Sequence, residues 1–130
     1  MGKFLFSQRS LKNLEGVHSD LVRVMHLALD LSTIDFAVLE GLRTPERQHE
    51  VIDSGNSWTK NSRHLTGHAV DVGVVIDKHV IWTYAWYERL SKFVKEAANE
   101  LKVPIEWGGD WKDKKDGGHY ELTWAAYPLK

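Results

Sequence analysis

The sequence contains no cysteine and has little excess charge of either sign. Without cysteine, disulfide bonds, thiolate metal ligands and thiol catalysis are excluded, so any metal must be held by histidine and carboxylate side chains. Seventeen basic residues against eighteen acidic ones give a net charge of -1, which leaves no basic surplus to neutralise a run of phosphates. We therefore expect no nucleic-acid partner, and a histidine-based nuclease is the weakest functional hypothesis.

Long apolar runs are also missing. The run Phe4-Leu5-Phe6 is far too short for the core of a signal peptide, and no later stretch reaches the length of a membrane span. We therefore expect synthesis in the cytoplasm, no signal peptide and no stable membrane anchoring. With 130 residues, of which 42% are hydrophobic and 27% charged, the chain fits a single domain, 1–130, around one core.

Apolar spacing and turn residues predict a mixed α+β domain. Helices are expected over 17–31 and 84–101, and Thr44, Pro45 and Glu46 are typical of the start of a third helix that ends near Ser54. The polar segment 56–67 favours a loop. Strands are expected over 34–42, 69–76, 79–82, 105–107 and 119–122. Because the order shows no regular βαβ rhythm, we expect a small antiparallel sheet with helices packed on one face.

Two stretches carry residues suited to chemistry. In Ser62-Arg63-His64-Leu65-Thr66-Gly67-His68-Ala69-Val70-Asp71, an aspartate interrupts an apolar strand, where a carboxylate is costly unless it is paired or binds a cation. In Asp116-Gly117-Gly118-His119-Tyr120-Glu121, a carboxylate and a histidine flank two conformationally free glycines. His64, Asp71 and His119 together offer two imidazoles and a carboxylate. Three protein ligands with a fourth position left for water are typical of a catalytic zinc site.

Other residues near these motifs have more than one interpretation. Asp116 lies three residues before His119, close enough to act on a water at the site. Strand alternation puts Glu121 on the face of His119, where it could orient that ligand, pair with Arg63 or compete with Asp116 as base. Most of the six tryptophans are expected to be in the core or partly buried, and Trp111, beside the second motif, is the best candidate to line a groove.

These residues resemble a known family. Ser-x-His-x-x-Gly-x-Ala-x-Asp followed by acid-x-x-His is similar to the signature of the D-Ala-D-Ala carboxypeptidase-like zinc peptidases. That family includes vancomycin-resistance D,D-dipeptidases and the L-alanyl-D-glutamate endopeptidases of bacteriophage endolysins. The segments 107–111 and 116–119 look like the endolysin branch, since D,D-dipeptidases carry glutamate where Asp116 stands. The segment Gly41-Leu42-Arg43-Thr44 resembles the one that carries the family's arginine, and the resemblance covers about 36–122.

The resemblance implies roles for individual residues. By this likeness His64, Asp71 and His119 bind zinc, Asp116 is the general base and then acid, Arg43 faces the substrate, and Ser62 contacts bound peptide. Trp111 and Glu121 complete the candidate substrate site. The implied fold is an antiparallel sheet flanked by helices, as in D,D-peptidases and Hedgehog domains, which agrees with the α+β architecture expected above.

The leading hypothesis is therefore a zinc-dependent peptidoglycan peptidase. It would cleave the L-alanyl-D-glutamate bond of the cell-wall stem peptide as a monomeric endolysin without a separate wall-binding module. It would wait in the host cytoplasm and reach peptidoglycan after the membrane is permeabilised. The alternatives are a cell-wall D-alanyl-D-alanine carboxypeptidase, for which an export signal would be expected, and a non-catalytic zinc-stabilised wall-binding module. The presence of Arg43 and Asp116 argues against the latter.

Overall fold

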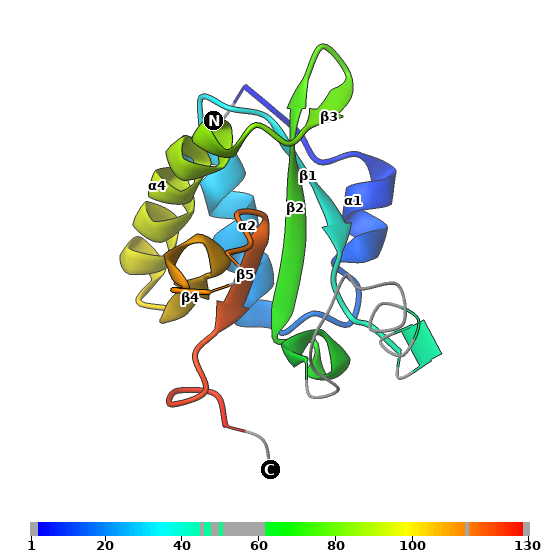
Figure 1. Ribbon diagram of the computed structural model, residues 1–130, viewed down its shortest axis with the longest axis vertical. Coiled ribbons are helices and arrows are strands. Elements are labelled where there is room, and N and C mark those ends of the chain that lie inside the picture. The colour runs from blue at the N-terminus through cyan, green and yellow to red at the C-terminus, as the bar shows by residue number, and fades with distance from the viewer. Residues whose placement is uncertain (1–2, 45, 48–49, 51–61, 114, 129–130) are drawn as a thin grey trace.

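The computed structural model describes residues 3–44, 46–47, 50, 62–113 and 115–128. Within these residues, three helices and five strands follow one another (Figure 1). The helices are α1 (Gln8–Asn13), α2 (Ser19–Leu31) and α4 (Tyr84–Leu101). The strands are β1 (Phe36–Glu40), β2 (Ala69–Ile76), β3 (His79–Ile81), β4 (Ile105–Trp107) and β5 (His119–Leu122). Two short 3-10 turns complete the order, η1 (Arg63–Thr66) and η2 (Gly108–Asp110).

The five strands form one antiparallel sheet with β2 at its centre. The strand order is β1-β2-β5-β4, and β3 pairs with the far end of β2. The long strand β2 therefore bonds to three others, which explains why it is the longest of the sheet. Val70 lies opposite Tyr120, and Asp71 lies opposite His119. The expected α+β fold with a small antiparallel sheet is confirmed.

Strand alternation gives the two faces of the sheet different characters. Val70, Val72 and Val74 point to one face, where they join Tyr120 in a core that includes the apolar sides of α2 and α4. The buried residues of the two helices are Leu21, Val24, Met25, Ala28, Leu29, Tyr87, Leu90, Val94, Ala97 and Ala98. The helices lie side by side against this face, while α1 lies beside β1 (Figure 1).

The opposite face of the sheet carries polar side chains. Asp71 alternates with the buried valines of β2, and the register places Glu40 of β1 and His119 of β5 on either side of it. A β-bulge between Val38 and Glu40 turns Glu40 to this face, although Val38 two residues earlier is in the core. The face that the helices leave open is thus the one on which charged groups gather.

Several expected elements have the bounds that the sequence predicts. The strands over 69–76, 105–107 and 119–122 and the helix over 84–101 match, whereas β1 and β3 are shorter than expected. The helix expected from 17 begins at Ser19 because the His18 Nδ1 atom caps it, accepting from the Asp20 N–H at 3.1 Å. Helix α1 was not expected, and η1 forms within the segment expected to be a loop.

The helix expected from Thr44 to Ser54 falls mostly outside the described residues. Thr44 Oγ1 does accept a hydrogen bond from the Arg47 N–H at 3.1 Å, as a helix N-cap does. Among the described residues, no helix has both the length and the apolar character needed to cross a lipid bilayer.

Candidate metal centre

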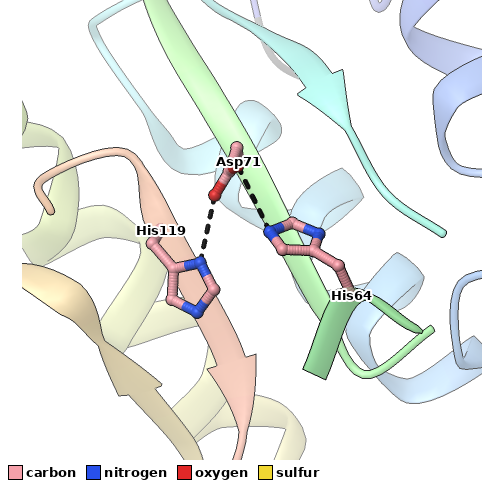
Figure 2. Close-up of side chains that lie close together, drawn as sticks. All are labelled: His64, Asp71 and His119. Carbon is pink, nitrogen blue, oxygen red and sulfur yellow. Dashed lines mark hydrogen bonds and ion pairs between the residues drawn. The ribbon is translucent and has the colours of Figure 1, made fainter. Parts of the chain in front are cut away.

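His64, Asp71 and His119 meet at one point on the open face of the sheet. Asp71 lies between the two imidazole rings, which come from η1 and β5 (Figure 2). His64 Nε2 is 3.2 Å from Asp71 Oδ2, and His119 Nδ1 is 3.0 Å from Asp71 Oδ1. One ligand atom from each residue lies within 4.8 Å of the other two, close enough for all three to share an ion.

The local sequence explains how His64 is held. Ser62 Oγ caps the short turn η1 by accepting from the His64 N–H at 3.2 Å. Gly67 ends the turn in the left-handed region with φ 74°, and a Cβ there would lie 2.3 Å from the Gly16 carbonyl oxygen. Glycine is therefore required both by the backbone conformation and by the close approach of the neighbouring loop.

Each histidine has a partner on its outer ring nitrogen. His64 Nδ1 lies 2.8 Å from the carbonyl oxygen of Gly41, which can only accept, so Nδ1 carries a proton. His119 Nε2 donates to Glu121 Oε1 at 2.7 Å. Such outer partners fix the orientation of metal-ligating histidines, and here they turn His64 Nε2 and His119 Nδ1 toward Asp71.

The donor set fits a divalent cation. His64 Nε2 is buried and, within the described part of the chain, makes no hydrogen bond of acceptable geometry. A lone pair left in that position is costly in a protein interior unless something binds it. Two imidazole nitrogens and one carboxylate oxygen are ligands that zinc accepts, with room for a fourth.

The electrostatics of the group favour an ionised aspartate. Burial would raise the pKa of Asp71, but the hydrogen bond from His119, the adjacent His64 ring and the positive charge of His119 hold that pKa well below its usual range. Burial would lower the pKa of His119, but hydrogen bonds to Asp71 and Glu121 outweigh it and raise the pKa to about 10. Without a metal, His119 is therefore an imidazolium ion between two carboxylates, and a bound cation would replace its proton on Nδ1.

Arg43 lies behind the metal-binding group. Its guanidinium is only 6% exposed, bonds to Glu40 through Nε at 3.0 Å and through a terminal nitrogen, and lies 3.5 Å from Asp71 Oδ2. The positive charge of Arg43 is thus fixed beside Asp71 by its ion pair with the partly buried Glu40.

A groove of about 380 Å³ opens over this face of the sheet. Its described lining consists of Leu39, Glu40, Arg47, Asp71, Val72, Trp82, Asp116 and Gly118. Asp116 and Asp71 therefore face the same space. Much of Asp116 is exposed, but its carboxyl group lies in the groove, where burial and then the negative charge of Asp71 raise its pKa. A hydrogen bond from the Gly118 N–H to Asp116 Oδ1, at 3.2 Å, fixes the side chain.

The other predicted site residues have different positions. Ser62 caps the turn that carries His64, and Glu121 lies behind His119 with 6% of its surface exposed. Neither is among the described residues that line the groove. The position of Glu121 favours the orienting role over that of a base. Trp111 contacts the edge of the group, with its ring centroid 5.1 Å from that of His119.

Trp82 and Arg47 line the groove although no sequence motif singles them out. The Trp82 side chain is 66% exposed and stacks parallel to Tyr87, 5.8 Å between centroids. An exposed indole with a fixed orientation suits a binding surface. The sequence signal that could have identified Trp82 is its position between a short strand and the start of α4.

Two other tryptophans do not contribute to the described lining of the groove. Trp58 lies outside the described residues. Trp107 is buried, and its Nε1 atom donates a hydrogen bond to the Gly117 carbonyl oxygen at 2.8 Å.

The family of the chain follows from its sequence as a whole. The family model described as phage L-alanyl-D-glutamate peptidase matches residues 1–123. The chain belongs to this family. Curated relatives include the L-alanyl-D-glutamate peptidase of Escherichia phage T5, 31% identical over 92% of this chain and 98% of that protein. The peptidase of the same name from Listeria phage A118 is also 31% identical, over 94% of this chain and 43% of that protein.

Solved structures agree with the family assignment. The Serratia marcescens L-Ala D-Glu endopeptidase ChiX is 47% identical, with a TM-score of 0.90 over 98% of this chain and 96% of that one. The vancomycin-resistance D,D-dipeptidase VanXYg shares 15% identity at a TM-score of 0.57, over 82% of this chain and 50% of that one, which shows a common fold. The expected phage L-alanyl-D-glutamate endopeptidase branch is thus confirmed, and the fold is that of the D,D-peptidases.

Proposed function

We propose that the protein is a zinc-dependent peptidase that cleaves the L-alanyl-D-glutamate bond of peptidoglycan stem peptides. The observation that carries this proposal is the His64–Asp71–His119 group, which lies at a groove also lined by Asp116, in a member of the phage L-alanyl-D-glutamate peptidase family. The grouped side chains would supply a metal site and, in Asp116, a separate acid–base group.

His64 Nε2, an oxygen of Asp71 and His119 Nδ1 would hold the zinc ion. When bound, zinc lowers the pKa of water from near 16 to about 7 and polarises a carbonyl group. The protein's contribution is to present three ligand atoms in fixed positions. Gly41 and Glu121 hold the two rings from behind, and the low pKa of Asp71 keeps its carboxylate charged at neutral pH.

Asp116 is suited to move the proton. As a carboxylate it can accept the proton of the attacking water, and with its pKa raised by burial and by Asp71 it can hold that proton and give it to the departing amine. Arg43 supplies a fixed positive charge beside Asp71, where it offsets negative charge that develops on the scissile carbonyl oxygen. Its burial and its pairing with Glu40 keep it from swinging away.

The decisive experiment combines metal and product analysis. We expect the purified chain to carry about one zinc ion and to release peptidoglycan fragments with a new N-terminal D-glutamate, identified by mass spectrometry. Release of free D-alanine instead would identify the carboxypeptidase alternative. Removing zinc with a chelator should abolish cleavage while the far-ultraviolet circular dichroism spectrum persists. Unfolding on chelation would instead favour a zinc-stabilised, non-catalytic module.

The proposed setting is a single-domain monomer that reaches peptidoglycan from the cytoplasm once the membrane is permeabilised. Lysis of cells that produce the enzyme only after their membrane is made leaky would support this route. Elution at the mass of a dimer would contradict the monomer. These measurements are independent of the product analysis above.

A further inference from the structure

The chemistry of the substrate places an anion close to the scissile bond. This step rests on the proposed function. D-glutamate has two carboxyl groups, and only one of them continues the peptide. The other is a free carboxylate unless it is amidated, and it lies within a few bonds of the nitrogen that is released. An enzyme that cleaves this bond must therefore accommodate a negative charge next to its metal centre.

The groove itself would repel such a charge. Its described lining includes three carboxylates, those of Glu40, Asp71 and Asp116. Like charges held a few ångströms apart in a partly desolvated groove disfavour one another. A substrate carboxylate therefore requires a positively charged side chain of the protein in addition to the metal ion.

Arg43 is poorly placed to be that cation. Its guanidinium is 6% exposed, it bonds to Glu40 and faces Asp71, and it is not among the described residues that line the groove. Moving it to the substrate would break its part-buried ion pair and leave Glu40 without that partner.

Arg47 has the position that Arg43 lacks. It is the only cation among the described lining residues, and its side chain is 56% exposed. Its contacts are loose, 3.6 Å to Glu40 Oε2 and 3.3 Å to Glu50 Oε2, and such solvent-exposed pairs contribute little. Glu40 keeps its bond to Arg43 when Arg47 turns away. The Arg47 backbone is fixed by its hydrogen bond to Thr44 Oγ1.

From these positions we propose that Arg47 binds the free carboxylate of the D-glutamate residue and makes the enzyme prefer substrates in which that group is not amidated. A guanidinium can donate hydrogen bonds to both carboxylate oxygens at once, whereas a neutral carboxamide has only one acceptor oxygen. Arg47 is thus a specificity-determining residue, while the acid–base step stays with Asp116.

Two synthetic peptides test this assignment. Both contain L-alanyl-D-glutamate, and they differ only in a carboxylate or a carboxamide at the free position. We expect the wild-type enzyme to cleave the carboxylate peptide with a kcat/KM about tenfold higher than that for the carboxamide peptide, mainly because its KM is lower. Arg47→Gln should lower kcat/KM for this peptide about tenfold and change that for the amide peptide less than about twofold. Arg47→Lys should retain part of the preference, because lysine keeps the positive charge but cannot bind both carboxylate oxygens as a guanidinium does.

Arg23→Gln is the matched control. Arg23 is 54% exposed and pairs with an acid three residues away, as Arg47 does, but it lies on α2, outside the groove. We expect both peptides to be cleaved by this variant as by the wild type. The inference is overturned if the wild type does not distinguish the peptides, or if Arg47→Gln preserves their ratio. Failure of the wild type to cut either peptide at the alanyl–glutamate bond would instead refute the proposed function.

Discussion

Replacement of Glu121 tests whether the partners behind the histidines prepare the site for metal. Glu121 is 6% exposed, and its Oε1 atom accepts from His119 Nε2 at 2.7 Å. This bond holds the imidazole with Nδ1 toward Asp71. In Glu121→Ala the ring loses its orienting partner, and a buried N–H loses its acceptor. In Glu121→Gln the amide oxygen can still accept, but the negative charge is gone.

The size of the effect follows from these contacts. Loss of an outer partner of a ligating histidine typically lowers metal affinity about 10–100-fold, which corresponds to about 1.4–2.7 kcal/mol. The Ala variant should lie near the upper end, since an unpaired buried donor adds a cost of about 1–3 kcal/mol to the folded protein. The Gln variant should lie near the lower end. The expected order of zinc affinity is wild type, then Gln, then Ala.

Competition with a chromophoric chelator at neutral pH measures these affinities without reference to catalysis. Circular dichroism of each metal-free variant checks that the fold is retained. Glu106→Gln is the control, because Glu106 lies opposite Glu121 in the β4–β5 register but is exposed. It removes a similar charge without removing the hydrogen bond. If folded Glu121→Ala bound zinc as tightly as the wild type, the argument from the outer hydrogen bonds would be refuted.

Three further predictions concern the acid–base group, pH and the turn that holds the first ligand. Asp116→Asn should keep its zinc but lose about 10²–10⁴-fold in kcat, measured by peptide hydrolysis and metal analysis, and an unchanged kcat would remove Asp116 from the mechanism. In the metal-free folded protein the pKa of His119 is raised to about 10, whereas in the unfolded chain it is near 6.5. The charged His119 therefore stabilises the fold fully at pH values below about 6.5, and this stabilisation is lost as the pH rises through 10. Urea denaturation of chelator-treated protein should therefore show lower stability at pH 10 than at pH 6, whereas equal stabilities would contradict the imidazolium assignment. Gly67→Ala should destabilise the protein by about 1–3 kcal/mol in thermal unfolding, because its φ is 74° and the new Cβ would lie 2.3 Å from the Gly16 oxygen.

Two of the three candidate metal ligands stand out in the sequence because their types differ from those of their neighbours. Asp71 interrupts a run of valines, where a carboxylate is costly without a partner, and His119 follows two glycines at the start of a short strand. Both conflicts are visible in the order of the amino acids alone, and they mark the two residues as functional. What the sequence could not provide was the β2–β5 register, which pairs Asp71 with His119 across 48 positions of the chain.

The unexpected helix α1 depends on tertiary contacts. It has only six residues, too few for a hydrophobic period to stand out. Its stability comes from the sheet edge, since Ser10 Oγ accepts from the Val38 N–H at 3.1 Å and Asn13 Nδ2 donates to the Val38 carbonyl at 2.8 Å. Neither contact can be inferred from local propensity. The same holds for the groove, where Trp82 and Arg47 become neighbours of Asp71 only through folding.

Core packing and the metal site are linked through a single alternation. On β2, Val70 lies in the core with the helices, and the next residue, Asp71, lines the groove. A slip of one residue between β2 and β5 would move every side chain of β2 to the other face, burying Asp71 among the helices and exposing the valines. The burial of Val70 opposite Tyr120 therefore fixes the position of Asp71 opposite His119. The apolar contacts that stabilise the fold therefore also set the register that brings the candidate ligands Asp71 and His119 together.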